Sequence, residues 1–134
     1  MLFRSTRTVA LGKLTTEAKK IYSIVLDAQR KAIDAAKSDM KTKDLDAVAR
    51  GYIKHRGYDR YYRHSLGHGI GLQIHEAPRI SVLSKAMLKT GNVITIEPGI
   101  YIPRFGGVRI EDDVVINNGT CEVLNRSSKE LIIL

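Results

Sequence analysis

Residues 64–76 read His-Ser-Leu-Gly-His-Gly-Ile-Gly-Leu-Gln-Ile-His-Glu, and the chain changes character around this stretch. From Tyr58 onward, glycines are frequent and β-branched residues come in short runs, a composition typical of strands and turns. Upstream of it, apolar residues recur instead at helical spacing. Helices followed by short strands predict an α+β fold in one domain.

Two amphipathic helices are predicted ahead of the histidine stretch. Thr15 or Thr16 can cap the first, whose apolar residues recur at helical spacing to about Lys37. Lysines and arginines decorate its other face, as in a helix with one buried side. The second helix is expected over residues 44–55, and Gly57 is a suitable residue to end it.

Short antiparallel strands are predicted after the helices. The segments with strand-like composition are residues 70–74, 93–97, 100–102, 108–116 and 122–124. Asn117-Asn118-Gly119 is a turn signal between the last two of these strands. A short strand is also expected over residues 4–11, and a helical turn over residues 83–88. The whole pattern predicts two helices plus an antiparallel sheet.

The composition excludes several classes of protein. Of the 134 residues, 43% are hydrophobic and 27% are charged, as in an ordinary globular domain rather than a disordered or collagen-like chain. We expect no membrane partner, because no apolar run is long enough for a membrane-spanning helix, and no secretory signal is recognisable. The single cysteine, Cys121, cannot form an internal disulfide, so the expected compartment is the cytoplasm.

The net charge of +8 is distributed unevenly along the chain. Residues 1–63 contain 15 Lys and Arg against 7 Asp and Glu, whereas residues 64–134 contain 7 of each kind. A basic half can bind nucleic acid, but a solvated helix surface is the simpler explanation. Aromatic residues are not interleaved with the bases as single-strand binding requires, so nucleic-acid binding is disfavoured.

His64, His68 and His75 are the first chemical signal, because they fall within one short glycine-rich stretch. Gly67 and Gly69 let the backbone bend around His68 and allow another chain or a ligand to approach closely. Such a cluster fits a metal or catalytic site and a hydrogen-bonded structural cluster about equally well.

Two acidic motifs further along the chain carry the second signal. Glu97 closes an otherwise apolar strand, where an acid must be solvated, paired or bound to a metal. Period-two alternation after Gly107 places Arg109, Glu111 and Asp113 on one face of a strand. A hairpin between the two strands brings Glu97 within a residue or two of the position opposite Glu111.

Glu97 and Glu111 would repel each other in this arrangement unless a cation lies between them. With the imidazole of His68 they form a mixed oxygen and nitrogen donor set, which suits Mn, Co, Zn or Fe better than Ca. The alternative is a surface pair of glutamates with Arg109 as their salt-bridge partner. The convergence of separate motifs favours the metal site.

The ordered motifs resemble those of the pita-bread metallopeptidases. The similar segments are the histidine stretch, Ile-Glu-Pro-Gly-Ile-Tyr at residues 96–101 and Gly-Gly-Val-Arg-Ile-Glu-Asp-Asp at residues 106–113. The match is to the proline-specific branch, the Xaa-Pro dipeptidases (prolidases) and aminopeptidase P, and it covers essentially the whole chain. It implies a partial pita-bread (creatinase/aminopeptidase-like) fold with a curved sheet, in a single truncated metallopeptidase catalytic domain over residues 1–134.

The resemblance also implies a site for two metal ions held by two aspartates, one histidine and two glutamates. Matched by motif, the metal ligands of this chain are His68, Glu97 and Glu111, and the ion is Mn, or Co or Zn. The catalytic residues are His64, His75, Glu97 and Arg109. The histidines would contact the substrate and steady the tetrahedral intermediate, and a glutamate would carry the proton.

The family's two aspartates are missing from this chain. The residue that matches the second is Arg4, a fixed cation that cannot ligate a metal, and the first would lie upstream. We therefore expect at most one ion here instead of two. The missing strands of the fold would leave a sheet edge and apolar surface open, which predicts a homo-oligomer or association with a missing N-terminal part.

The resemblance thus predicts a metal-dependent peptidase acting on Xaa-Pro bonds, incomplete in this chain, whose substrate is a peptide with proline at the second position. The alternative is a noncatalytic remnant of the fold that binds peptide or a protein partner, which the missing aspartates favour. Nucleic-acid binding through the basic helices is a third reading that charge alone supports.

Overall fold

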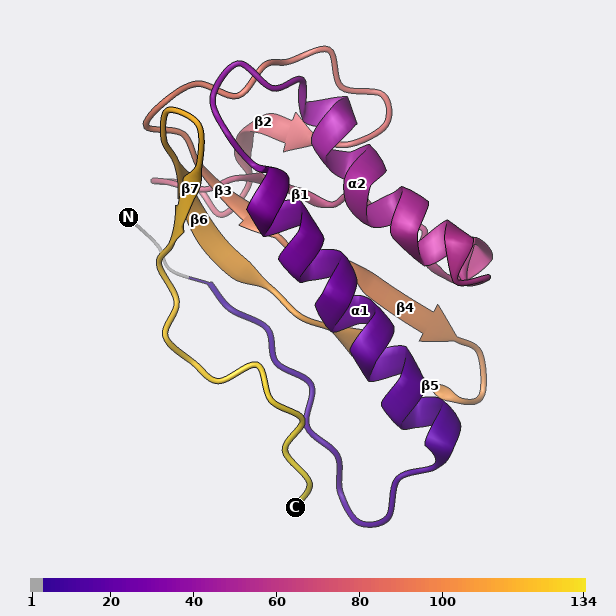
Figure 1. The fold of residues 1–134 in the computed structure, drawn as a ribbon. Coiled ribbons are helices and arrows are strands. Elements are labelled where there is room, and N and C mark those ends of the chain that lie inside the picture. Colours follow the sequence, from indigo (N-terminus) through magenta and orange to yellow (C-terminus); the bar gives the residue numbers. More distant parts are fainter. Residues whose placement is uncertain (1–3) are drawn as a thin grey trace.

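The structure, a computed structural model, describes residues 4–134. Two helices, α1 (Thr16–Ala35) and α2 (Thr42–His55), and a short 3-10 helix, η1 (Asp59–Tyr61), precede the named strands. The strands are β1 (Gly67–Gly69), β2 (Glu76–Ile80), β3 (Val93–Ile96), β4 (Gly99–Ile102), β5 (Gly106–Arg109), β6 (Asp112–Ile116) and β7 (Cys121–Val123). The α+β class, with two helices followed by antiparallel strands, is confirmed (Figure 1).

Local sequence determines where each helix begins and ends. The Thr15 hydroxyl accepts a hydrogen bond from the backbone N–H of Ala18 (3.1 Å) and caps α1. Helix α2 begins slightly earlier than predicted, because the N–H and hydroxyl of Thr42 both bond to the Ala86 carbonyl, at 3.0 and 3.1 Å. Beyond α2, Gly57 adopts a φ of +85°, which favours glycine and turns the chain out of the helix.

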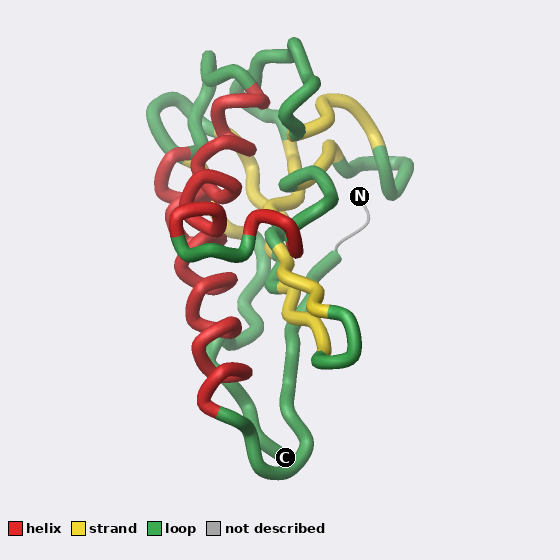
Figure 2. The backbone as a smooth tube through the Cα atoms, turned by 90° about the vertical axis from the view of Figure 1, so that its right-hand side faces the viewer, coloured by secondary structure: helices red, strands yellow, loops and turns green. Residues whose placement is uncertain are grey.

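Five strands form one antiparallel sheet in the order β2-β1-β3-β6-β7, and β4 pairs with β5 in a separate hairpin. Figure 2 shows the helices lying together on one side of the strands. Alternate residues of β3 and β6 join the apolar core beneath the helices, namely Ile94, Ile96, Val114 and Ile116. The helices therefore cover one face of the sheet.

The opposite face of the sheet is polar, and we call it the polar face. It carries the residues that alternate with the core positions of β3 and β6, so that Thr95 lies opposite Asp113. Both residues are fully buried although no helix covers them. The N-terminal segment, residues 4–10, runs beside them and forms a β-bridge from Thr6 to Glu111.

The strand predicted over residues 70–74 is wrong. β1 ends at Gly69, and the chain then leaves the sheet in a loop where the Glu76 carboxylate accepts a hydrogen bond from the Gln73 N–H (2.7 Å). Strand β2 follows this loop and was not predicted from the sequence. Pro78 lies in the middle of β2, and proline is tolerated there because β2 is an edge strand.

The strand predicted over residues 108–116 is two strands, β5 and β6, which separate at Ile110 and Glu111. Strand β5 pairs with β4, whereas β6 pairs with β3. The segment of the same chain that lies opposite Ile110 and Glu111 connects β3 to β4 and contains Pro98. The ladder is interrupted there because proline has no N–H to donate.

Two other predicted elements are also different. The predicted strand over residues 4–11 makes only isolated bridges, at Thr6 and Ala10, because these two residues pair with different parts of the chain. Residues 83–88 are not helical: Leu83 belongs to a turn, closed by a bond from the Ser84 N–H to the Ser81 carbonyl (3.1 Å), and Met87 forms a bridge to Lys41, the residue that precedes α2.

The N-terminal and C-terminal segments lie side by side (Figure 1). The Ala10 N–H donates to the Ile132 carbonyl (2.9 Å), and the Leu134 N–H donates to the Ala10 carbonyl (2.8 Å). The Gly12 N–H donates to the Leu134 carbonyl (2.8 Å). These bonds hold the segment that covers the polar face. Neither α1 nor α2, the α-helices within residues 4–134, has the length and apolar character needed to cross a membrane.

Candidate active site

Strand β1 places His68 on the polar face between two glycines. A Cβ atom at Gly67 would lie 1.9 Å from the Thr95 carbonyl oxygen, and one at Gly69 would lie 2.2 Å from the Ala77 carbonyl oxygen. Only glycine fits at these two positions, because neighbouring backbone passes so close. The close approach that the glycines predicted is therefore made by the chain's own strands, and His68 is the one side chain of β1.

His68 and Glu97 form a hydrogen-bonded pair on this face. The Nε2 atom of His68 lies 3.2 Å from Oε1 of Glu97, and each side chain is 13% exposed. The bond to Glu97 raises the pKa of His68 above its usual 6.5, although burial opposes the shift. Burial pushes the pKa of Glu97 upward, but hydrogen bonds from His68 and Thr95 outweigh burial and lower that pKa. Both partners are therefore favoured in their charged forms.

The backbone fixes the orientation of the His68 ring. Its Nδ1 atom lies 2.9 Å from the carbonyl oxygen of Gly69, which can only accept a hydrogen bond. Nδ1 therefore carries a proton, and Nε2 is the atom directed at Glu97. A metal ion at Nε2 would have to displace the proton that bonds to Glu97.

Thr95 connects the two members of the pair and was missed by the sequence reasoning. Its buried hydroxyl accepts a hydrogen bond from the His68 backbone N–H (3.1 Å) and donates one to Oε1 of Glu97 (3.0 Å). The available signal was its position two residues before Glu97, which places both side chains on the same face of an extended strand.

Glu97 and Glu111 lie opposite each other across neighbouring chain segments. On either side of them, Ile96 pairs with Asp112 and Gly99 pairs with Arg109, and both pairs belong to the same antiparallel register. Extended between these pairs, the register places the backbone positions of Glu97 and Glu111 opposite each other, as the hairpin predicted. Thr6, which was also missed, donates its hydroxyl to Oε2 of Glu111.

The buried carboxylates of the polar face are only partly satisfied. Glu111 is 1% exposed, and its Oε1 atom has no hydrogen-bond partner among residues 4–134. Asp113 is fully buried, and its Oδ1 atom likewise has no partner within that range. Burial raises the pKa of Asp113, and the neighbouring charge of Glu111 adds to that effect. Carboxylate oxygens in this state are suitable ligands for a cation.

The donor set formed by His68, Glu97 and Glu111 fits a divalent cation in its chemistry. It combines one imidazole nitrogen with two carboxylates, and it includes the unpartnered oxygen of Glu111. In their present rotamers, however, no three His, Cys, Asp or Glu side chains of residues 4–134 converge closely enough to hold an ion. Binding would therefore require side-chain rotation and loss of the His68–Glu97 hydrogen bond.

A pocket of about 420 Å³ joins most of the predicted site residues. Its lining consists of His64, Ser65, Gly67, His68, His75, Glu76, Arg79, Glu97 and Arg109. All four predicted catalytic residues and His68 are thus brought together, whereas Glu111 is not part of the lining. The rings of His68 and His75 lie 4.2 Å apart between centroids.

Two nitrogen atoms of the pocket residues are buried without a partner among the described residues. One is Nε2 of His64, whose ring packs edge-on against Tyr62 and Tyr101 at centroid distances of 5.0 and 5.6 Å. The other is Nε of Arg109. The Nδ1 atom of His64 lies 2.8 Å from the Ser65 carbonyl, so Nε2 is left free for a bound molecule.

Comparison with known proteins adds to this geometry. The profile of metallopeptidase family M24 matches residues 3–118. The chain is 53% identical over 127 residues to the Xaa-Pro dipeptidase of Pyrococcus furiosus, covering 95% of this chain and 36% of that protein. It superposes on the Xaa-Pro dipeptidase from Bacillus anthracis with a TM-score of 0.96 at 48% identity, covering 97% of this chain and 37% of that one.

The X-Pro aminopeptidase from Thermotoga maritima is also similar in structure. Its TM-score is 0.93 at 43% identity, again covering 97% of this chain and 37% of that chain. The chain therefore spans little more than a third of the length of these relatives. Its fold matches part of the prolidase fold, as the sequence motifs predicted. With a profile match over most of its length and close agreement in fold, the chain belongs to metallopeptidase family M24.

Proposed function

We propose that this chain carries the metal-binding and substrate-binding residues of a peptidase that acts on Xaa-Pro bonds. The observation that supports this most directly is the pocket in which His64, His68, His75, Glu97 and Arg109 meet. The names of the similar proteins indicate the substrate class, a peptide with proline at its second position.

In this proposal His68, Glu97 and Glu111 hold one divalent ion. One imidazole and two carboxylates suit manganese, and also cobalt or zinc. When bound, the ion supplies a Lewis acid for the peptide carbonyl and a water activated near neutral pH. His68 contributes the lone pair of Nε2, while its Nδ1–H stays bonded to Gly69.

The remaining groups act on the proton and on the developing charge. Glu97, which accepts a hydrogen bond from the Thr95 hydroxyl, would accept the proton of the attacking water. His64 and His75 face the same pocket and hydrogen-bond the substrate's carbonyl oxygen as it gains negative charge. Arg109 adds a fixed positive charge to that wall.

The proposal is tested by incubating the full chain with Mn²⁺ and Ala-Pro, and measuring the proline released. We expect hydrolysis of Ala-Pro, much less hydrolysis of Ala-Ala, and loss of turnover in Glu97→Gln and Glu111→Gln. Glu122→Gln is the matched control, because Glu122 is exposed on β7 and outside the pocket. Turnover that survives both site substitutions would contradict the proposed roles.

The alternative function is a noncatalytic peptide-binding domain. The observation in its favour is that no three donor side chains of residues 4–134 converge on an ion position. On that reading, Ala-Pro binds with the same affinity with and without Mn²⁺, and no proline is released. Isothermal titration with the dipeptide separates this outcome from the peptidase.

We further propose that residues 1–134 form a single catalytic domain. We also propose that this domain self-associates or binds a separate N-terminal part of the fold. Exposed apolar side chains on the N-terminal segment, the β4–β5 connection and the C-terminal segment support this, including Leu11, Phe105 and Leu134. Sedimentation velocity is expected to show species heavier than one chain. The cytoplasm is the proposed compartment, since Cys121 has no disulfide partner within residues 4–134.

A further inference from the structure

The N-terminal segment runs antiparallel beside residues 109–113 on the polar face. Thr6 is bridged to Glu111, and the Glu111 N–H donates to the Thr6 carbonyl (3.0 Å). Two residues earlier, the Arg4 N–H donates to Oδ2 of Asp113 (2.8 Å). Opposed residues of an antiparallel pair place their side chains on the same face, and extended chain repeats every second residue. Arg4 therefore lies on the face that carries Glu111 and Asp113.

The structural bonds of Arg4 are made by its backbone. Its carbonyl accepts a hydrogen bond from the Asn125 side chain (2.9 Å), and its N–H is bonded to Asp113. Within residues 4–134 its guanidinium forms no hydrogen bond or ion pair. The positive charge of Arg4 therefore lies on the polar face and is not paired with any one carboxylate of residues 4–134.

The charge of Arg4 lies beside the acidic groups of the polar face. The register places Arg4 opposite Asp113 and two residues from Thr6, whose hydroxyl bonds to Oε2 of Glu111. Side chains that share one face of an antiparallel pair interact, so the guanidinium acts electrostatically on these carboxylates.

We propose that Arg4 serves as a resident positive charge of the polar face, and that it weakens the binding of a divalent cation by His68, Glu97 and Glu111. The inference rests on the proposed metal site. Its physical basis is charge balance, because an arginine stays protonated and compensates the buried carboxylates that would otherwise attract a cation. The low exposure of Glu111 and Asp113 limits solvent screening of that charge.

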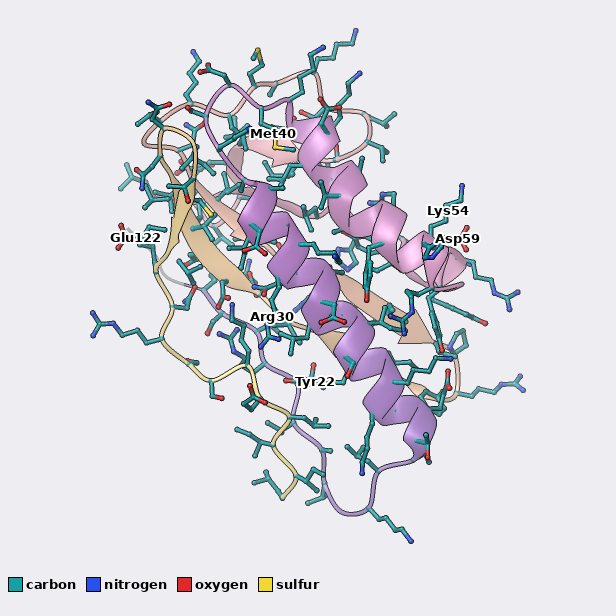
Figure 3. The ribbon with its side chains drawn as sticks, viewed as in Figure 1. Tyr22, Arg30, Met40, Lys54, Asp59 and Glu122 are labelled. Atoms are coloured by element: carbon teal, nitrogen blue, oxygen red, sulfur yellow. The ribbon has the colours of Figure 1, made fainter. Side chains whose placement is uncertain are left out.

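The test measures Mn²⁺ affinity of the full chain by isothermal titration calorimetry. Arg4→Gln removes the charge and keeps the backbone bonds, so we expect binding tighter by about tenfold or more at low salt. Arg4→Lys keeps the charge and should bind as the unsubstituted chain does. Arg30→Gln is the matched control, because Arg30 is exposed on α1 and changes the net charge equally (Figure 3).

The outcomes separate a local charge effect from other causes. The proposal is supported if Arg4→Gln binds more tightly, Arg4→Lys and Arg30→Gln do not, and the difference narrows as NaCl is raised. It is overturned if Arg4→Gln binds no more tightly, or if Arg30→Gln has the same effect. Arg4→Met provides a second neutral variant, and thermal unfolding checks that each variant is folded. Because the readout is affinity, a chain that fails to hydrolyse Ala-Pro still tests this inference.

Discussion

At the scale of the residue, the state of His68 depends on two oxygen atoms. The Gly69 carbonyl and the Glu97 carboxylate both accept from the ring, so the hydrogen-bonded pair is complete when the imidazole carries both protons. Thr95 adds a third link, because its hydroxyl bonds to both residues of the pair. The site is thus held together by mutual hydrogen bonds that a metal ion would have to replace.

The stability that this pair contributes is expected to have a pH window. The folded pKa of His68 is raised, chiefly by Glu97, so its contribution is full below the usual 6.5 and is lost as pH rises through the folded value. Hydrogen bonds lower the folded pKa of Glu97 against the effect of burial, so its contribution is full above the usual 4.5 and is lost at more acidic pH. Glu97→Gln should therefore cost most stability between 4.5 and 6.5, about 1 kcal/mol.

Urea unfolding of both proteins across this range measures the effect. An equal loss of stability at pH 5 and at pH 9 would show that packing, not the ion pair, is responsible. Imidazole resonances followed by NMR provide an independent check, since Glu97→Gln should lower the pKa of His68.

Thr95→Val tests the hydrogen bonds that Thr95 makes to both residues of this pair. Valine has nearly the same shape, but it leaves the His68 N–H without its side-chain acceptor and removes one bond to Glu97. Because Thr95 is fully buried, we expect a loss of about 1–3 kcal/mol in the free energy of unfolding. Thr95→Ser keeps the hydroxyl and should retain more of the bonding, so a serine variant less stable than the valine variant would argue against this role.

At the scale of the element, the close approach of neighbouring backbone determines which residues fit in strand β1. Its glycines lie between β2 and β3, and the carbonyl groups of Thr95 and Ala77 occupy the space of a side chain. The strand can therefore present His68 only because its neighbours in sequence have no Cβ atom.

Gly67→Ala is expected to separate β1 from β3. The added methyl would meet the Thr95 carbonyl oxygen at 1.9 Å, and backbone cannot move aside as a flexible side chain can. The expected loss is about 1–3 kcal/mol or more. Gly51→Ala is the matched control, because Gly51 lies in α2 with nothing within 4 Å of the new atom. Helix propensity predicts a gain of up to about 1 kcal/mol for this control. Thermal unfolding of both variants measures these effects. If Gly67→Ala unfolds at the same temperature as the unsubstituted chain, the packing argument is refuted.

The elements with a strong local pattern were predictable from the sequence. Helix α1 shows a cap and helical spacing, β3 shows a β-branched run, and β4 precedes a hairpin turn. Strand β2 escaped prediction because it contains Pro78 and owes its structure to β1 beside it. The N-terminal segment was misread for a related reason, since Thr6 and Ala10 take their partners from distant parts of the chain.

Some features of the candidate site were likewise predictable from the sequence, and others were not. The juxtaposition of Glu97 and Glu111 follows from counting back through a hairpin, so the sequence sufficed. The histidines were identified by motif. The spacing of Thr95 and Glu97 indicates a shared strand face, but the sequence does not reveal which groups the hydroxyls of Thr6 and Thr95 bond to, because packing places those groups beside them.

At the scale of the whole molecule, the buried carboxylate of Asp112 joins parts that are far apart in sequence. Its two oxygens accept bonds from Arg7 (2.6 Å), Gln29 (2.8 Å) and Lys129 (2.6 Å). These partners belong to the N-terminal segment, α1 and the C-terminal segment, while Asp112 begins β6. One side chain therefore connects the sheet, a helix and both ends of the described chain.

Asp112→Asn should be strongly destabilising. It removes the negative charge that two cations share in a site where Asp112 is fully buried, and breaking a buried ion pair costs about 3–5 kcal/mol. Burial works against the charged form, but Lys129, Arg7 and Gln29 lower the pKa of Asp112, so the contribution disappears as pH falls through the folded value. Asp34→Asn, at an exposed position of α1, is the control. Urea midpoints that differ little between the two variants would contradict this assignment.

The three backbone bonds between the two terminal segments hold the N-terminal segment in place beside the polar face. The bonds involve Ala10 and Gly12 of this strand-like segment and its continuation. Thr6, whose hydroxyl bonds to Glu111, lies upstream of them. Deleting residues 132–134 should therefore speed hydrogen–deuterium exchange of the Ala10 and Gly12 amides by about tenfold or more, with a smaller effect spreading toward Thr6. A C-terminal truncation or a bulky fusion tag that breaks these bonds would therefore disturb Glu111 through Thr6, although neither change contacts that glutamate.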